Sequence, residues 1–526
     1  MSMSASFSRQ GSRLAGLEGE VVLPGQERFD EARRAFNLAA DQEPAAVVFA
    51  ESARDVAAAV TFAAGQGQRI AAQGTGHNAL PLGSLIGTIL LETERMRGIQ
   101  IDPETVAVFV DGWTIDAAAQ VAGLDEDQAL DRSEALARHS LVHLDHTEFG
   151  LRSRMLETIR EFVAGRLAAR PDVAEVERRH ADYYRALAEQ ADRPLRGAGQ
   201  SQWADRLQAD AGNLAAAVRW YLARDPKPLP HLFRVLWLFW FLRDHQGEAR
   251  PWIDQLLPAA GSLGPQDQAE LLWTAAVIAN EVGDDPAALT ASERLAPLLD
   301  EIEDPYLHAV SRLVMASISG IVGDFGGALR GALVSLEQLR GQDEPFWTAL
   351  AAYTVGFAET AAGRYDDALG HLSEMRELGE RFGNAWLTAA SRVVLGTLAV
   401  AQGRPQEARP LLEEGLDLSL AAGSTQNVTL CLAAFARLAF AEGDPEGAAL
   451  LAGAAEGLRR RVGLQAWPLL RREEAELIAR VTRALGADRF HELFSAGAQL
   501  NRWQARAAAR DRRGADAARQ ARLNNS

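Results

Sequence analysis

The chain has 526 residues, of which 48% are hydrophobic and 24% charged, a composition typical of globular proteins and a length typical of several domains. Its formal net charge of −17 disfavours binding of the chain as a whole to nucleic acid or to anionic membranes. The single cysteine, Cys431, excludes an internal disulfide and a cysteine-based metal cluster and is typical of a reducing compartment. We therefore expect a cytoplasmic protein.

Two further features exclude classes of protein. No apolar run approaches the roughly 20 residues of a membrane-spanning helix, and the most apolar stretch, LFRVLWLFWFL at 232–242, predicts a buried helix. The only lysine is Lys227, within DPKPLP. A phosphate-binding P-loop needs a lysine directly after its glycines, so the sequence indicates no P-loop ATPase site.

The segment 19–108 has the alternation of an α/β domain, after a disordered N-terminus expected over 1–18. The strand-like runs EVVLP, AAVVFA, RIAAQG and GTILLE are interrupted by the helix-like run ESARDVAAAVTFAAGQ. Ser52 is expected to cap that helix, with Asp55 three residues further on.

A glycine-rich string, RIAAQGTGHNALPLG at 69–83, ends the third strand-like run and is followed by TILLETERMRGIQIDPE. These strings resemble the first half of a PCMH-type FAD-binding domain, the fold of the berberine-bridge-like flavin oxidases. The resemblance implies a turn whose backbone amides hold the FAD pyrophosphate, where glycine permits close approach. It also implies that His77 matches the position that binds the flavin ring covalently in many members. The implied cofactor-binding residues are Gln73, Gly74, Thr75, Gly76, His77 and Asn78.

This resemblance covers about 90 residues, and the family's second flavin-binding stretch and substrate domain have no counterpart in the sequence. Two hypotheses stay open for the segment: it binds FAD, or it is a remnant that keeps the α/β fold without the cofactor. No catalytic residue is assigned in it.

Residues 109–170 predict a short helix, a second helix, a β-hairpin and a strong helix, which is a winged-helix pattern. His139, His143 and His146 lie near Asp145 in RHSLVHLDH, and histidines beside a carboxylate can bind zinc. On a strand, however, residues 143 and 146 face opposite sides, so we expect polar residues of a wing and no metal site. Residues 171–265 are expected to form a helical connector.

A 40-residue repeat follows in the C-terminal half. Its markers are the glycines Gly283, Gly323, Gly363, Gly403 and Gly443, and the alanines Ala288, Ala328, Ala368, Ala408 and Ala448. Glycine accepts the left-handed conformation that ends a helix, and a small alanine lets two helices cross closely. The spacing predicts helix–turn–helix units that must stack to bury their apolar faces.

We therefore predict a tetratricopeptide-like all-α solenoid over 266–500. Because the period exceeds the roughly 34 residues of the standard unit, we expect extra residues in the outer helix or in the loop between units. The aromatic residues of the repeats, and Cys431, are expected to be core residues.

A second resemblance covers the chain from about Val110 to about Phe494. Its strings are GWTIDAAAQVAG, ALARHSLV, SRMLETIREFVAGRL, RRHADYYRALAE, WADRLQADAGNLAAAVRW and LLAGAAEGLRRRVGLQAWPLLRRE. They resemble the winged-helix and tetratricopeptide-like part of large bacterial signal-transduction ATPases with LuxR-type organisation. That resemblance implies a regulatory sensor whose repeats receive an inducer or a partner. The family's P-loop module and terminal helix-turn-helix have no counterpart here, so neither ATP hydrolysis nor sequence-specific DNA binding is implied.

The segment 501–526 is basic, with seven arginines and two aspartates, a net charge of +5 (7 − 2). Arg502, Arg506 and Arg510 share one face if the segment is helical and can contact phosphate or an acidic partner. The expectation is a solvated or frayed tail.

Three functions stay open from the sequence. The first is a regulatory or scaffold protein that binds a protein, a peptide or a small inducer through its repeats. The second is an FAD-linked oxidoreductase. The third is a fusion of partial domains without activity.

Overall fold

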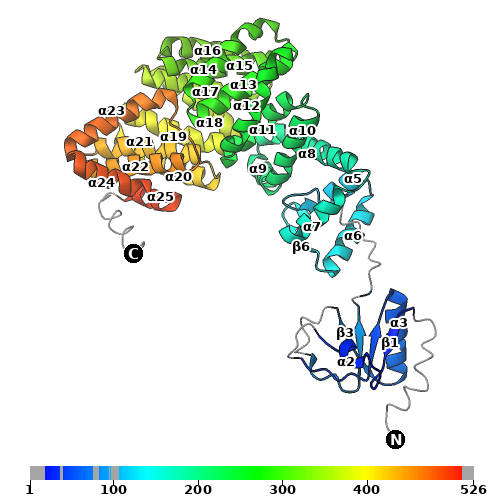
Figure 1. Cartoon of the computed structure of the whole chain (residues 1–526). Helices are drawn as coiled ribbons and strands as arrows, with labels where there is room; N and C mark the ends of the chain where they lie inside the picture. Colours follow the sequence, from blue (N-terminus) through cyan, green and yellow to red (C-terminus); the bar gives the residue numbers. More distant parts are fainter. Residues whose placement is uncertain (1–17, 36–39, 75–81, 94, 96–105, 512–526) are drawn as a thin grey trace. The chain divides into compact units, whose positions relative to one another are not determined.

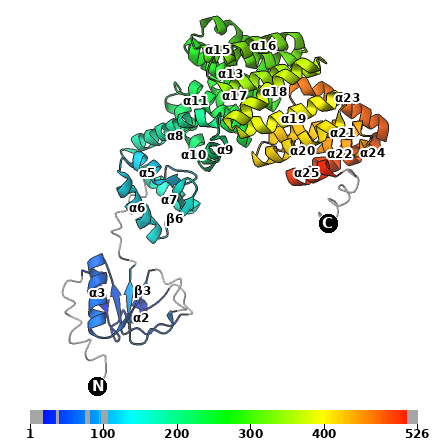
Figure 2. The ribbon, with the colours of Figure 1, turned by 180° about the vertical axis from the view of Figure 1, so that it is seen from behind.

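The computed structural model describes residues 18–35, 40–74, 82–93, 95 and 106–511. The chain divides into two compact units, Met1–Asp102 and Pro103–Ser526, and each is described by itself (Figure 1 and Figure 2). The division lies at 102/103 and not at the expected 108/109. Phe109 belongs to the second unit, where its ring stacks on Trp113 and meets the edge of His180.

The first unit contains a four-stranded sheet of order β1-β2-β4-β3. Its strands are β1 (Glu20–Val22), β2 (Ala46–Phe49), β3 (Arg69–Gln73) and β4 (Thr88–Glu92). Strands β2, β4 and β3 run parallel, and β1 pairs antiparallel with β2. The four strand-like runs of the sequence are therefore strands, and the small N-terminal α/β fold is confirmed.

Helices cover both faces of this sheet. Side chains alternate between the faces of a strand, so Val48 packs with Ala59 of α3 (Ala53–Gly65), while Val47 packs with Ala32 of α2 (Phe29–Ala32). The side chain of Ser52 accepts a hydrogen bond from the amide of Asp55 at 3.3 Å, which confirms the expected cap of α3.

Asp55 ties the N-terminal strand to the start of α3. Its buried carboxylate accepts hydrogen bonds from the backbone amides of Glu18, Gly19 and Glu51, at 2.7, 3.1 and 2.9 Å. Burial raises the pKa of Asp55, but these backbone donors outweigh it and hold the pKa below its ordinary value.

The second unit begins with a small mixed region of helices and strands. Its elements are β5 (Trp113–Thr114), α5 (Ile115–Ala122), α6 (Glu126–Arg138), β6 (Val142–Thr147), β7 (Gly150–Met155) and α7 (Glu157–Leu167). The sheet is antiparallel with the order β5-β7-β6. The two helices, the hairpin and the third helix follow in the predicted order, and only the short strand β5 was not predicted.

A buried ion pair attaches the hairpin to the helices that follow. The guanidinium of Arg152 in β7 contacts the carboxylate of Asp210 at 2.7 Å, and both side chains are buried. Nearby, the His180 ring packs against Phe109 and Tyr184. Burial lowers the pKa of His180 to about 4, so this ring is neutral at neutral pH.

The connector is helical, as expected. It comprises α8 (Val173–Leu195), α9 (Gln200–Ala209), α10 (Ala211–Arg224), α11 (Leu229–Arg243), α12 (Gln246–Leu256) and the 3₁₀ helix η3 (Leu257–Ser262). The apolar run at 232–242 lies in α11 and is buried except for half-buried Arg234, which pairs with Glu270 at 2.9 Å. None of the described helices has the length and apolarity needed to cross a bilayer.

Five helix pairs form the solenoid. They are α13 (Pro265–Val282) with α14 (Asp285–Leu295) and η4 (Ala296–Glu301), α15 (Pro305–Ser319) and η5 (Gly320–Val322) with α16 (Phe325–Arg340), α17 (Pro345–Ala361) with α18 (Tyr365–Phe382), α19 (Ala385–Ala401) with α20 (Pro405–Ala421), and α21 (Thr425–Ala441) with α22 (Pro445–Arg461). The predicted all-α solenoid is confirmed, and its helix pairs end at 461.

The 40-residue period arises from both helices of a unit. Helices α19, α20, α21 and α22 each have 17 residues, and three-residue turns separate them. The extra residues were expected in the outer helix or in the loop between units; in these two units both helices have the same length. All five marker glycines have positive φ, between 68° and 83°, as a left-handed helix end requires.

A second glycine series, which was not part of the prediction, also recurs at the 40-residue period. Gly383, Gly423 and Gly463 also have positive φ, between 65° and 72°, and they follow the second helix of their units. The marker alanines are buried at the helix crossings. At one crossing Ala368 faces Gly356, where an added Cβ would lie 3.2 Å from the Ala368 carbonyl oxygen, so the two backbones are in close contact.

Three helices follow the repeats: α23 (Pro468–Leu485), α24 (Ala487–Ala498) and α25 (Arg502–Arg510). The expectation of a solvated tail was wrong for α25, which packs on the repeats through buried Ala505, Ala508 and Ala509. Arg506 and Arg510 both pair with Asp417 of α20. Two of the three arginines that were candidates for phosphate contact therefore form ion pairs within the fold.

Candidate functional site

The glycine-rich turn of the first unit lies only partly within the described residues. Gln73 is the last residue of β3, and Gly74 follows it. Thr75, Gly76, His77 and Asn78 lie outside the described residues. The proposed covalent position, His77, therefore remains a prediction.

The strand ends beside this turn form a polar edge. Gln73 donates a hydrogen bond to Glu92 of β4 at 2.7 Å, and both side chains are buried. The Oε1 atom of Gln73 has no hydrogen-bond partner. Because ligands of parallel sheets bind beyond the carboxyl ends of the strands, this edge is where a phosphate-binding turn belongs.

The histidines of the hairpin do not form a site. His139 ends α6, while His143 and His146 lie on β6 with exposed side chains. Among the described residues, no group of three or more histidine, cysteine or acidic side chains is arranged to hold a metal ion. Cys431 is buried in α21, and its thiol donates to the carbonyl of Leu412 at 3.2 Å.

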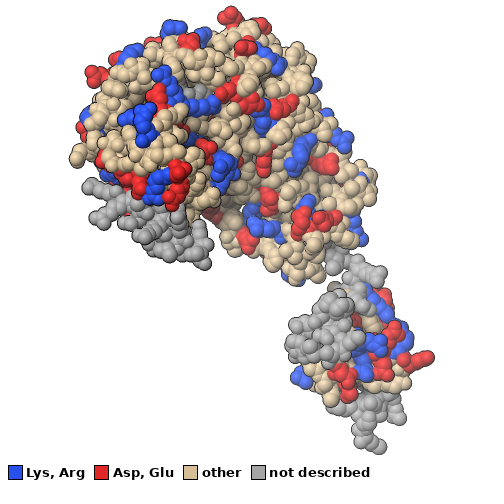
Figure 3. Space-filling view, turned by 60° about the vertical axis from the view of Figure 1, so that its left-hand side comes forward, with Lys and Arg blue, Asp and Glu red and all other residues tan. Residues whose placement is uncertain are grey.

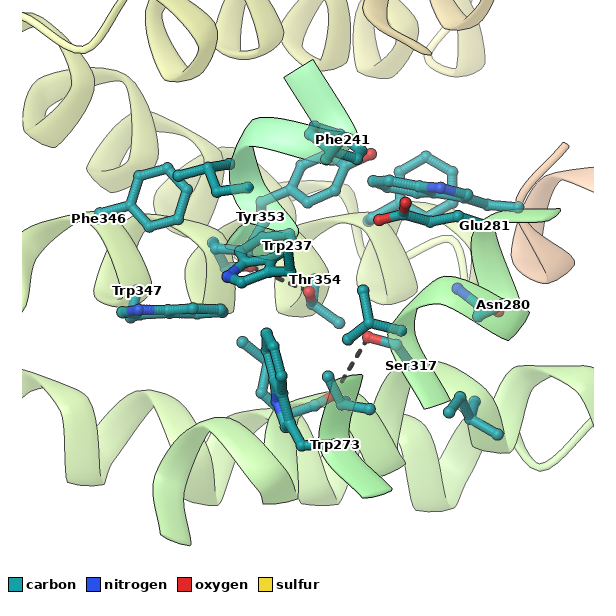
Figure 4. Close-up of a pocket in the computed structure, with 18 of the residues that line it drawn as sticks. Trp237, Phe241, Trp273, Asn280, Glu281, Ser317, Phe346, Trp347, Tyr353 and Thr354 are labelled. Atoms are coloured by element: carbon teal, nitrogen blue, oxygen red, sulfur yellow. Dashed lines mark hydrogen bonds between the residues drawn. The ribbon is translucent and has the colours of Figure 1, made fainter. Parts of the chain in front are cut away.

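The second unit contains an apolar pocket on the first helices of successive pairs (Figure 4). The enclosed space is about 110 Å³. Helices α11, α13, α15, α17 and α19 contribute to its wall. Its aromatic residues are Trp237, Phe241, Trp273, Phe346, Trp347, Tyr353, Phe357, Trp386 and Trp467. The expectation that the aromatic residues serve only as core was therefore incomplete, because these rings also line a cavity.

Glu281, at the end of α13, is the only Asp, Glu, Lys, Arg or His residue of this lining. In Figure 4 its carboxyl end points toward Phe241 and the neighbouring rings. Glu281 is 6% exposed, and its Oε2 atom has no hydrogen-bond partner. Burial is the main cause that raises the pKa of Glu281 to about 8; the amide of Gln246 acts against it, and the nearby Asp244 adds a smaller upward contribution.

A segment from the end of the solenoid covers this pocket. We call residues 463–467, which join α22 to α23, the closing segment. The backbone amide of Gln465 donates to the carbonyl of Glu281 at 3.2 Å, and the Trp467 ring lies 5.3 Å from the Tyr353 ring. Just beyond it, Arg471 pairs with Asp285. The last repeat is thus bridged to the first, and the bridge supplies one wall of the pocket.

The pocket was missed in the sequence because its residues are far apart along the chain. One signal was present: Tyr306, Phe346 and Trp386 stand 40 residues apart at the start of successive first helices. An aromatic residue that recurs at the period marks one face of the solenoid. The sequence alone does not tell whether that face is filled or hollow.

The charged side chains of the second unit are mixed over the face shown in Figure 3. Arginines and acidic residues alternate there, and ion pairs such as Arg340–Glu374 and Arg392–Glu414 join neighbouring helices. On this face, the residues drawn in colour form no extended basic surface of the kind that binds nucleic acid.

Two family models match parts of the chain. A model described as FAD binding domain matches residues 44–126, and a tetratricopeptide repeat model matches 347–421. The chain is 33% identical over 175 residues to putative HTH-type transcriptional regulators of Mycobacterium tuberculosis and Mycobacterium bovis, which covers 32% of this chain and 19% of each relative. It is 35% identical over 101 residues to the glucooligosaccharide oxidase of Sarocladium strictum, which covers 19% of this chain and 20% of that protein. The chain thus spans about a fifth of the length of these relatives.

Two solved structures align with part of this chain. One is a signal transduction ATPase with numerous domains and a tetratricopeptide repeat sensor from Pyrococcus horikoshii, with a TM-score of 0.38 and 14% identity, over 76% of this chain and 62% of that one. The other is a Rap protein complexed with competence and sporulation factor, with a TM-score of 0.42 and 14% identity, over 65% and 99%. At these TM-scores neither structure bears on function.

The chain therefore combines an FAD-binding-domain segment with tetratricopeptide repeats and is similar over a third of its length to regulators. Of the described residues, Gly74 lies at the strand edge where a phosphate-binding turn belongs, whereas the unpartnered Gln73 Oε1 is a hydrogen-bond acceptor and does not itself suit a phosphate. The flavin-domain match runs on to residue 126, but Phe109 and Trp113 lie in the core of the second unit.

Proposed function

We propose that this chain is a cytoplasmic regulatory protein whose tetratricopeptide repeats bind an inducer in the aromatic pocket. The observation that carries the proposal is the pocket itself, which the first helices of successive pairs line and the closing segment covers. Binding sites of small molecules are concave, mostly apolar and supplied with few polar groups. The pocket has this character, with Glu281, Asn280 and Ser317 among its polar residues.

The closing segment links binding to the whole solenoid. Because Trp467 contacts the pocket while Arg471 pairs with the first helix pair, a bound inducer would favour the arrangement in which the last and the first pairs are bridged. A ligand shifts such an equilibrium only by its difference in affinity for the two arrangements. The region 109–170 would act as a winged-helix-like module that reports this change to a protein partner.

A thermal-shift screen of small molecules and short peptides tests the proposal. A ligand that binds only the folded chain raises the melting temperature, so we expect at least one class of compound to do so. The variant Trp467→Ala should lose the shift. Trp503→Ala is the matched control, because Trp503 is an exposed tryptophan on α25, outside the pocket. A shift that persists undiminished in Trp467→Ala, or no shift with any compound, contradicts the proposal.

A second candidate function is favoured by the FAD-binding-domain match at 44–126, namely FAD binding by the first unit as part of an oxidoreductase. The glycine-rich turn with His77 would hold the cofactor, which supplies redox chemistry when bound. The absorbance of the purified full chain, alone and with added FAD, checks this. Flavin bands that survive acid precipitation in the wild type but not in His77→Ala support it. A colourless protein that does not change on adding FAD excludes it.

A further inference from the structure

The wall of the pocket combines many aromatic rings with a single carboxyl group. Glu281 is that group, and no arginine, lysine or histidine lines the pocket, in a chain that has 54 basic residues. We propose that the pocket binds a compact organic cation, an alkylammonium group, with the aromatic rings around it and Glu281 as its counter-ion. This inference rests on the proposed function and specifies the chemistry of the ligand.

Three of the aromatic rings pack directly against one another and form one wall that can face a cation. The rings of Trp237, Trp273 and Trp347 lie 5.4 to 5.7 Å apart in all three pairs, and Figure 4 shows them on the side of the pocket away from Glu281. A cation over the face of tryptophan is attracted by the ring quadrupole, most strongly where water is excluded. All three rings are buried, so this attraction is not screened by solvent.

Among the described residues, Glu281 has no basic side chain as its partner. Other buried glutamates of the solenoid are paired: Glu270 with Arg234, and Glu359 with Arg364 and His371. Around Glu281 lie the acidic Asp244, the amide of Gln246 and the closing segment through the backbone of Gln465. Neither amide atom of Gln246 has a hydrogen bond of good geometry. A buried polar group without a partner costs folding free energy, and a bound cation would remove that cost.

The protonation state of Glu281 agrees with this role. Its pKa of about 8 makes the empty carboxyl group neutral at pH 7. Asp244 disfavours its ionisation, and the basic residues that act on Asp244, namely Arg243, His245 and Arg502, do not line the pocket. An ammonium group would favour the ionised form, so its binding should release a proton.

The size of the pocket restricts the cation. Its space of roughly 110 Å³ is of the same order as the ~150 Å³ of an apolar cavity that accommodates benzene. A trimethylammonium group is compact enough for such a space, whereas an extended peptide is not. The polar end of the ligand can meet Asn280 or Tyr353, which each have a side-chain oxygen without a partner.

Calorimetry on the full chain with three probes of matched shape tests the inference. The probes are choline, its neutral isostere 3,3-dimethyl-1-butanol and the anion 3,3-dimethylbutanoate. We expect choline to bind at least about tenfold more tightly than the alcohol, and the anion not to bind. In Glu281→Gln the affinity for choline should fall at least about tenfold, while that for the alcohol should change little. Choline binding at pH 7 should release a proton from the wild type, seen as a dependence of the heat on the buffer, and none from the variant.

The controls separate this inference from the proposed function. Glu293→Gln removes an exposed carboxylate of the same helix pair and should leave all three affinities unchanged. If choline and the alcohol bind equally tightly, the proposed preference for a cation is wrong, but the pocket remains a ligand site. If none of the probes binds to the wild type, the proposed cation binding is also wrong. The compound screen with Trp467→Ala then tests the proposed function independently. Circular dichroism of Glu281→Gln shows whether the variant is folded.

Discussion

The two candidate ligand regions of this protein are built in opposite ways. The edge of the first unit depends on one turn after one strand, and its marker residues lie within six successive positions, 73–78. The pocket of the second unit draws its wall from five helices and the closing segment, between residues 237 and 467. The edge is therefore a local feature that a motif reveals, whereas the pocket exists only if the whole solenoid holds its helices in place. Four predictions test this contrast.

The largest effect is expected for Gly457→Leu. Gly457 of α22 lies directly against the backbone of Ala498 in α24, so a Cβ at this position has no room. Forcing two backbones apart should cost the second unit about 4 kcal/mol of unfolding free energy and weaken the pocket. Urea unfolding monitored by tryptophan fluorescence measures the loss.

Gly370→Leu is the matched control for that change. Gly370 is an exposed glycine of α18 with nothing near an added Cβ, so leucine there should stabilise the helix by about 0.5–1 kcal/mol. If both leucines had the same effect, the close contact of α22 and α24 would not be what stabilises the end of the solenoid.

The next effect concerns the first unit alone. Asp55→Ala leaves the amides of Glu18, Gly19 and Glu51 without their acceptor. These three hydrogen bonds are partly buried, and a donor that loses its acceptor there is costly, so the first unit should lose about 3 kcal/mol. Hydrogen exchange should show faster exchange in β1 and β2 and unchanged exchange in α13–α22. Faster exchange in the repeats would show that the two units are coupled.

A pH-dependent effect is expected at Glu281. Its folded pKa of about 8 lies above the ordinary 4.5, so between these values the folded chain holds a proton that the unfolded chain has lost. Stability then falls as the pH rises, by about 1.4 kcal/mol per pH unit from this group. The stability of Glu281→Gln relative to the wild type should therefore increase from pH 5 to pH 8, as measured by denaturant titrations.

The stability contribution of His180 has a pH dependence of the opposite sign and serves as an internal comparison. Burial lowers its folded pKa from 6.5 to about 4, so the unfolded chain binds the extra proton in this window. Stability from this group is present above pH 6.5 and is lost as the pH falls toward 4. A difference between Glu281→Gln and the wild type that does not change with pH would contradict the assignment to Glu281.

The smallest effect is expected for Asp417→Asn. Asp417 pairs with Arg506 and Arg510, and all three side chains are more than a third exposed. Such pairs contribute less than about 1 kcal/mol and are screened by salt. The variant should release α25 to limited proteolysis more readily at low salt, with little change in the melting temperature. A large loss of stability would mean that the charges, and not the three buried alanines, hold α25.

Much of the architecture could be predicted because it is locally encoded. The four strands of the first unit follow from runs such as AAVVFA and RIAAQG, and the cap of α3 follows from Ser52. The helix pairs follow from a glycine that ends each helix and an alanine at each crossing. These features depend on the backbone conformation of a few neighbouring residues, and the types of those residues determine that conformation.

The rest could not be predicted because it depends on residues that are distant along the chain. The docking of α25 needed Asp417 and the repeat surface, so the arginines alone indicated only a basic tail. By itself, the sequence determined the period of 40 residues and therefore a stack of helix pairs. Only the tertiary structure decided that the stack is bridged from its last pair to its first, since a contact between Gln465 and Glu281 has no local signature. That bridge leaves a cavity among buried tryptophans, with an unpaired carboxyl group in its wall.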